Sequence, residues 1–137
     1  MSKIFSIGVD IEFKHLDTQK FVNHSNIYTY IENTYINFFM KEIKTGWTFS
    51  NMPILLKESN TQFLKPIKED SNLMAELEVI NVRSKGVEVC VKIKEKKDMA
   101  VCYAIGKRVL IYCDLTTGLP LNFEEELFMK LKEYCNT

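Results

Sequence analysis

The sequence lacks a long uninterrupted apolar run. Its first 13 residues contain no extended apolar stretch of the kind found in signal peptides, and no segment approaches the roughly 20 apolar residues that a membrane-spanning helix needs. The sequence also lacks a charge bias, because 18 Lys and Arg residues balance 18 Asp and Glu residues. Such a chain has no general electrostatic attraction to nucleic acid. We therefore expect a soluble, cytoplasmic protein with no membrane span and no nucleic-acid partner.

Closely spaced cysteines are also missing. The four cysteines are Cys90, Cys102, Cys113 and Cys135. No two of them have the Cys-x-x-Cys spacing of a zinc or redox site, and in strand-like segments a reduced cysteine behaves as a small hydrophobic residue. His15 and Asp17 are close enough in sequence to suggest a metal pair, but no third ligand accompanies them. We expect neither a metal nor a cofactor.

Apolar residues are plentiful, at 46% of the 137 residues. A chain of this size can bury a core, and no repeat or linker divides it, so we expect a single domain over residues 1–137. Alternating apolar residues predict strands, and apolar residues at helical spacing predict helices. The predicted strands are 5–13, 53–63, 72–82, 87–94 and 99–115, and the predicted helices are 26–44 and 123–134. These elements indicate an α+β fold in which an antiparallel sheet wraps around one long helix.

The longer predicted helix is apolar on several sides, so we expect it to be the most buried element. Asn23 and the polar residues after it offer capping side chains at its start, and Gly46 offers a stop. Gly106 predicts a bulge or bend in the last strand. Asn122, with Glu125 three residues later, predicts a capping box for the second helix.

The polar residues around the start of the long helix form the pattern that carries a family resemblance. They are Asp17, the step Val22-Asn23-His24, and Glu32. Together with residues 63–93 and 104–127, they resemble the hotdog-fold acyl-CoA thioesterases, in particular the 4-hydroxybenzoyl-CoA thioesterase branch. The resemblance implies a hotdog fold, with about five strands around one central helix. The chain departs from the family pattern at Lys20, where Gly is frequent and its backbone freedom is useful, and at Ile27, where an aromatic residue is common.

The resemblance implies catalytic roles near the start of the helix. Asp17 would attack the thioester carbonyl or deprotonate a water, and the backbone N–H of His24 would stabilise the oxyanion. From the residues alone, a loop carboxylate, or a favourable charge near a helix N-terminus, is the commoner role for a residue such as Asp17. Asn23 could orient water or cap the helix, and capping is the common role. The His24 imidazole could be a base, a water-positioning group or a cap.

The remaining candidate residues concern substrate binding. Glu32 would line the pocket by resemblance, although a Glu on such a helix usually faces solvent. Arg83 and Lys85 could meet the phosphates of CoA, although most surface Lys and Arg residues only add solubility.

The resulting prediction is an acyl-CoA thioesterase, with CoA as part of the substrate. The resemblance implies a homodimer or homotetramer with its site at the subunit interface, and such pairing also covers an exposed sheet edge. The alternatives are an acyl-carrier-protein thioesterase, another hotdog enzyme such as a hydratase, and a non-catalytic protein that binds acyl ligands.

Overall fold

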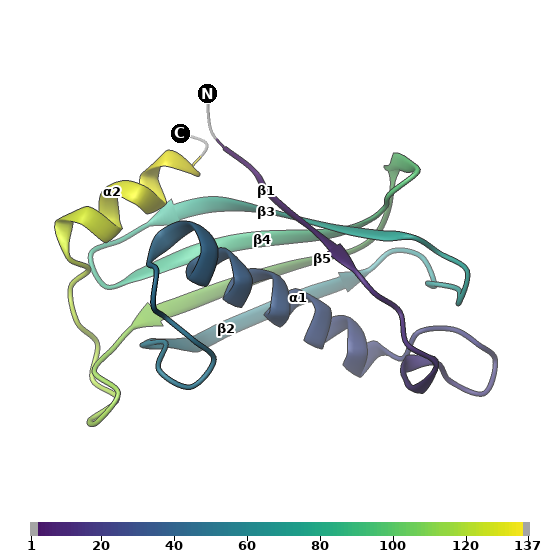
Figure 1. Cartoon of the computed structure of the whole chain (residues 1–137), viewed down its shortest axis with the longest axis horizontal. Coiled ribbons are helices and arrows are strands. Elements are labelled where there is room, and N and C mark those ends of the chain that lie inside the picture. The colour runs from purple at the N-terminus through teal and green to yellow at the C-terminus, as the bar shows by residue number, and fades with distance from the viewer. Residues whose placement is uncertain (1–2, 136–137) are drawn as a thin grey trace.

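A computed structural model describes residues 3–135 and confirms the predicted α+β hotdog architecture, with one five-stranded antiparallel sheet and one long helix. The elements in chain order are β1 (Phe5–Val9), the 3-10 turn η1 (Phe13–His15), α1 (His24–Phe38), the π-helical segment η2 (Phe39–Ile43), β2 (Ile54–Phe63), β3 (Leu73–Val82), β4 (Gly86–Glu95), β5 (Asp98–Tyr112) and α2 (Glu125–Glu133). The strand order in the sheet is β1-β3-β4-β5-β2, so the first two strands form its two edges. Helix α1 lies across one face of the sheet (Figure 1).

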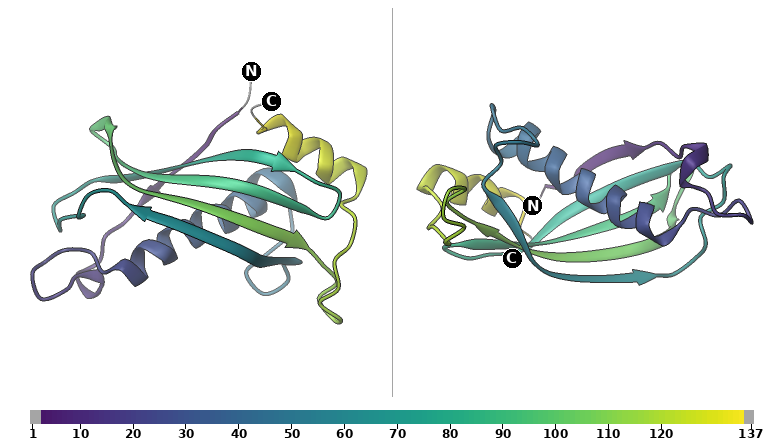
Figure 2. Two further views of the ribbon diagram at one scale, coloured as in Figure 1. Left: turned by 180° about the vertical axis from the view of Figure 1, so that it is seen from behind. Right: turned by 90° about the horizontal axis from the view of Figure 1, so that it is seen from below.

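The hydrophobic core lies between α1 and the sheet. Ile31 and Phe38 of α1 are fully buried, as are Leu77 and Val89 of the two strands that they face. Among residues 3–135, no helix covers the other face of the sheet (Figure 2). The expectation that this helix is the most buried element is wrong: its buried residues share one side and Tyr28 is exposed on the other, whereas most residues of β4 are buried.

The long helix begins two residues earlier than predicted. Asn23 is its N-cap, and the Asn23 Oδ1 accepts hydrogen bonds from the backbone N–H of Ser25 at 3.0 Å and from the Ser25 hydroxyl at 2.9 Å. After Phe38 the chain continues into the π-helical η2, which ends at Ile43. The helical backbone ends at Lys44, which has an extended conformation with a φ of −144°. Gly46 has a φ of 100°, a conformation that favours glycine, but it lies in the turn after this end and is not the predicted stop itself.

Strand β1 is shorter than the predicted strand 5–13. Val9 pairs with Leu73, which is the first residue of β3. Residues after Val9 therefore have no partner strand, and the chain turns into η1 instead. The alternation of apolar residues continues past the point where pairing ends, which is why the sequence pattern overestimates this strand.

The predicted bulge at Gly106 is wrong, because its pairing with Thr61 and Val91 continues without a shift. A Cβ atom added at Gly106 would lie 2.6 Å from the Cδ1 atom of Ile31. Gly106 therefore permits the close approach of α1 to the sheet. The register of β2 against β5 shifts elsewhere, between Leu56 and Glu58.

The C-terminal helix α2 begins at Glu125, two residues later than predicted. Its N-cap is Glu124, whose side chain makes no capping hydrogen bond. The predicted capping box is therefore wrong. The backbone N–H of Phe123 donates to the carbonyl of Ser84 at 2.7 Å, which ties this segment to the β3–β4 turn. Leu127 and Leu131, which lie at helical spacing, are buried. Among residues 3–135, no helix combines the length and apolar character needed to cross a membrane.

Candidate active site

Asp17 lies in a tight loop between η1 and α1. Its backbone N–H donates to the carbonyl of Phe21 at 2.7 Å, which closes the loop at residues 17–21. The Asp17 Oδ1 accepts hydrogen bonds from the backbone N–H groups of Gln19 at 2.9 Å and Phe21 at 3.0 Å. Within the described residues, the other carboxylate oxygen accepts no hydrogen bond. One oxygen of Asp17 therefore fixes the orientation of the carboxylate and the other is available for chemistry.

The start of α1 supplies a hydrogen-bond donor next to this loop. Asn23 caps the N–H of Ser25, so its side chain has the structural role that the residue type favours. Within residues 3–135, no hydrogen bond uses the backbone N–H of His24, as expected for the first residue of a helix. The His24 imidazole stacks on the ring of Phe63, with centroids 4.4 Å apart and planes 21° from parallel.

Asp17, Asn23 and His24 line one pocket of about 430 Å³. Another wall of the pocket consists of Phe63, the last residue of β2, and the segment 64–67 that follows it. This wall is held in place by the backbone N–H of Val22, which donates to the carbonyl of Ile67 at 2.8 Å. Sequence reasoning did not assign this wall to the site, although Pro66 signals an irregular segment there.

Three predicted substrate-binding residues lie outside this pocket. Glu32 is exposed on α1, about two turns after His24. Arg83 and Lys85 are exposed in the β3–β4 turn, next to α2 and at the opposite end of the sheet from the start of α1 (Figure 1). Within one chain, the structure therefore brings together the three predicted catalytic residues but not the predicted CoA-binding residues. Lys65 is a basic residue that does line the pocket.

Arg108, on β5 next to the edge strand β2, is a buried cation that sequence analysis did not identify as a candidate. Arg108 is 3% exposed, and its Nη1 and Nη2 donate to the Lys107 carbonyl and the Thr61 hydroxyl, both at 2.9 Å. The guanidinium lies 5.6 Å from the ring centroid of Tyr28. Burial lowers the pKa of Arg108, and Tyr35, Tyr28 and Glu32 act in the opposite direction.

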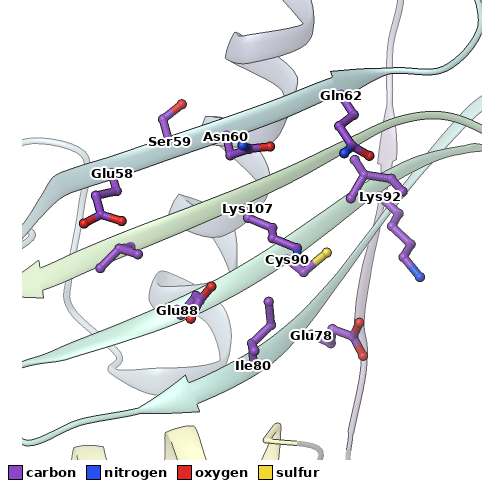
Figure 3. Close-up of a pocket in the computed structure, with 12 residues that line it drawn as sticks. Glu58, Ser59, Asn60, Gln62, Glu78, Ile80, Glu88, Cys90, Lys92 and Lys107 are labelled. Carbon is purple, nitrogen blue, oxygen red and sulfur yellow. The ribbon is translucent and has the colours of Figure 1, made fainter.

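The outer face of the sheet carries a larger groove of about 930 Å³. Figure 3 shows its side chains on the sheet face opposite to α1, among them Glu88, Cys90 and Lys107. Burial raises the pKa of Cys90, which keeps its thiol protonated and weakly nucleophilic. The groove is lined by strands only, so it offers no helix N-terminus for an oxyanion. The smaller pocket at α1 is therefore the better candidate for acyl transfer.

The suggested metal pair of His15 and Asp17 does not converge. The His15 Nδ1 lies 2.8 Å from the hydroxyl of Tyr30, whereas the Asp17 carboxylate bonds its own loop. Among residues 3–135, no three His, Cys, Asp or Glu side chains are grouped so that they could hold a metal ion.

Comparisons with known proteins agree with this architecture. The model of the thioesterase superfamily matches residues 19–102, a range that begins two residues after Asp17. None of the curated proteins matches the chain significantly.

Solved structures of several thioesterases have the same fold. A predicted thioesterase from Bacillus stearothermophilus superimposes with a TM-score of 0.87 at 13% identity, over 97% of both chains. A thioesterase from Thermus thermophilus, complexed with coenzyme A and Zn, gives 0.81 at 18% identity, over 93% of this chain and 90% of that one. A 1,4-dihydroxy-2-naphthoyl-CoA thioesterase from Synechocystis gives 0.81 at 10% identity, over 95% of this chain and 96% of that one.

Proposed function

The chain belongs to the thioesterase superfamily and is a thioester hydrolase by family, and from this premise we propose that it hydrolyses an acyl-CoA to a free acid and CoA. The observation that carries the proposal is the pairing of two groups on one pocket. The Asp17 carboxylate has one oxygen without a hydrogen bond, and the His24 backbone N–H at the start of α1 is likewise unused among the described residues.

The start of α1 is suited to the developing oxyanion. When a nucleophile adds to the thioester carbonyl, the carbonyl oxygen gains negative charge. The N–H of His24 and the positive end of the α1 dipole favour that charge, and a donor of this kind contributes about a hundredfold to a thousandfold in rate. The stacking of the His24 ring on Phe63 holds the side chain against β2, so the backbone N–H is the group of His24 that we assign to catalysis.

Asp17 is assigned the role of base or nucleophile. As a base, it takes a proton from water while the water oxygen bonds to the carbonyl carbon. The C–S bond then breaks, and the CoA thiolate leaves and takes up the proton. As a nucleophile, Asp17 first forms a mixed anhydride with the acyl group and releases CoA, and water then cleaves the anhydride. Both routes consume one water and release one acid and one thiol.

CoA is the proposed thiol because the Thermus relative is complexed with coenzyme A and the Synechocystis relative is named for a CoA thioester. Lys65, on the pocket wall, is a basic residue placed to meet a CoA phosphate. Arg83 and Lys85 remain predicted contacts, which a partner subunit would have to bring to the site. Glu32 likewise remains a predicted pocket residue, which a partner subunit would have to bring to the site.

We also propose that the protein forms a homodimer or a dimer of dimers. β2 is an edge strand with Leu55, Leu56 and Phe63 exposed on it. An exposed apolar edge favours pairing with a second edge. Phe63 also borders the pocket, so a partner at β2 would lie beside the site.

The decisive experiment measures CoA release from a panel of acetyl, medium-chain, long-chain and aromatic acyl-CoAs. We expect Asp17→Asn to lower kcat by about a hundredfold to ten-thousandfold. Its melting temperature should barely change, because the amide oxygen can still accept the hydrogen bonds from Gln19 and Phe21.

Asp114→Asn is the matched control. The Asp114 Oδ1 accepts hydrogen bonds from the backbone N–H groups of Thr116 at 2.8 Å and Thr117 at 3.0 Å, so it also caps its own loop, and it does not line the pocket. This variant should keep wild-type turnover. Near-normal turnover of Asp17→Asn would contradict the mechanism. If the wild type binds acyl-CoA but releases no CoA, the protein is a non-catalytic acyl binder. If it acts only on acyl-carrier-protein substrates, the thiol of the substrate belongs to the carrier protein and not to CoA.

A further inference from the structure

His15 occupies a position next to the proposed catalytic loop, outside its pocket. It is the last residue of η1 and precedes Asp17 by two residues. Its carbonyl accepts hydrogen bonds from the backbone N–H of Asn23 at 2.8 Å and from the side-chain amide of Asn26 at 3.3 Å. Because Asn23 is the N-cap of α1, the backbone of His15 joins the base of the Asp17 loop to the start of the helix.

The His15 ring makes a second connection to the same helix. Its Nδ1 lies 2.8 Å from the hydroxyl of Tyr30, and the two rings meet edge to face with centroids 5.5 Å apart. The backbone N–H of Glu12 donates to the same Nδ1 at 3.1 Å. Tyr30 is 4% exposed and lies two turns into α1. The ring therefore links η1 to a point on the helix well beyond its N-cap.

These hydrogen-bond partners define which ring nitrogen of His15 lacks a proton. A backbone N–H can only donate, so the bond from Glu12 requires an Nδ1 without a proton. Tyr30 must then be the donor in the second bond, so the two donors share the single lone pair of Nδ1. This is consistent with the pKa of Tyr30 being raised to about 12 by burial and by Glu12. In a neutral ring the proton lies on Nε2, 3.9 Å from the Glu12 carboxylate.

Rigid placement of Asp17 needs more than its own loop. The loop bonds fix the carboxylate relative to Phe21, and the carbonyl of His15 fixes the loop relative to Asn23. The direction of η1 relative to the helix axis, however, depends on a contact farther along α1. The contact from Nδ1 of His15 to Tyr30 supplies that second point.

We propose that His15 is a positioning residue, which holds the Asp17 carboxylate at the start of α1 by accepting hydrogen bonds at Nδ1 from Tyr30 and from the Glu12 backbone. This inference rests on the proposed function of Asp17. His15 does not line the pocket of Asp17 and His24, so it acts only through the loop. A displacement of about 1 Å at a reacting group can cost about a hundredfold in rate, so a positioning contact of this kind has a measurable effect.

The test compares two substitutions that differ in one acceptor. In His15→Asn, the Oδ1 takes the place of Nδ1 and can accept both hydrogen bonds. In His15→Phe, an aromatic ring remains but the acceptor is lost. We expect kcat to fall by about tenfold to a hundredfold in His15→Phe and to stay within about threefold of wild type in His15→Asn. KM should change little in either variant.

Tyr30→Phe tests the same contact from the helix side. It replaces His15→Phe in the comparison if that variant folds poorly. It should lower kcat, and the double variant His15→Phe/Tyr30→Phe should be no slower than the slower single variant, because both changes remove one shared interaction. All kinetics are measured well below the melting temperature of each variant, so that loss of folded protein does not contribute.

Amide hydrogen exchange provides a readout that does not depend on activity. In His15→Phe, the backbone amides of Asp17 and Asn23 should exchange about tenfold faster than in wild type, whereas in His15→Asn they should not. Equal kcat in the Phe and Asn variants, or unchanged exchange in His15→Phe, would overturn the inference. If wild-type protein releases CoA from no substrate, the proposed function fails on its own, and the exchange rates still decide whether His15 holds the loop.

Discussion

At the scale of single residues, Lys20 bears the backbone strain of the loop that carries Asp17. It has a φ of 65°, and it is the one residue other than glycine in the described chain with a positive φ. This conformation costs an L-residue about 1–2 kcal/mol. The departure from glycine noted in the sequence therefore falls at a position where the structure does need left-handed backbone.

We expect Lys20→Val to lower the free energy of unfolding by about 1–2 kcal/mol relative to Lys20→Asn, because β-branched residues avoid this region and Asn tolerates it. Both variants lose the 3.9 Å contact with Glu69, so their difference isolates the backbone. Denaturant unfolding gives the two values. Equal stabilities would show that the loop relaxes to another conformation.

Two buried tyrosines predict a loss of stability at high pH. Burial raises the pKa of Tyr30 and Tyr134 from 10.0 to about 12, with nearby Glu12 and Glu42 adding to the rise. The unfolded chain therefore loses these protons first, so the stabilisation is complete below about pH 10 and disappears as the pH rises through about 12. Melting temperatures measured from pH 8 to 12 should fall across that window. Replacing both tyrosines by Phe should flatten the fall, and an unchanged slope would contradict the assignment.

The sequence made part of the site predictable. Asp17, Asn23 and the start of α1 are adjacent in the chain, so a local pattern is enough to relate them. The wall from Phe63 to Ile67 comes to the pocket through long-range pairing, which local patterns do not record. The contact between His15 and Tyr30 is similarly hidden, because it depends on how η1 folds back over the helix.

At the scale of elements, the approach of α1 to the sheet depends on the absence of a side chain at Gly106. We expect Gly106→Ala to lower the free energy of unfolding by about 1–3 kcal/mol, because its Cβ would press on the fully buried Ile31. Gly8→Ala, in β1, is the matched control, since a Cβ there has no atom within 4 Å. Thermal or denaturant unfolding compares them. If the two variants were equally stable, the helix would have room to shift.

Element types were predictable because the apolar periods of helix and strand differ. The ends of the helices and strands were less predictable. β1 stops where β3 begins, and α2 starts after Phe123 has bonded Ser84. The passage from α1 into the π-helical η2 also left no trace in the period of apolar residues. Each of these ends is set by a partner elsewhere in the fold.

At the scale of the whole molecule, the free edge of β2 is the surface at which we expect two subunits to pair. We expect the wild type to sediment as a dimer or tetramer at micromolar concentration, and Leu56→Lys, at a half-exposed position of that edge, to shift it toward monomer with its circular dichroism unchanged. Met129→Lys alters a similarly exposed apolar residue on α2, which packs against β3 rather than β2, and should leave the assembly intact. A wild-type monomer, or equal behaviour of both variants, would contradict an interface at β2.

The strand order also has a consequence for how the chain folds. β3, β4 and β5 follow one another through short turns, so their pairing requires little loop closure, whereas β1 and β2 must find distant partners at the two edges. Closing long loops is the slow part of folding for such topologies. The central meander should therefore form before either edge. Since the pocket lies where the loop before α1 meets the segment after β2, the folding chain should pair its three central strands before it assembles the proposed active site.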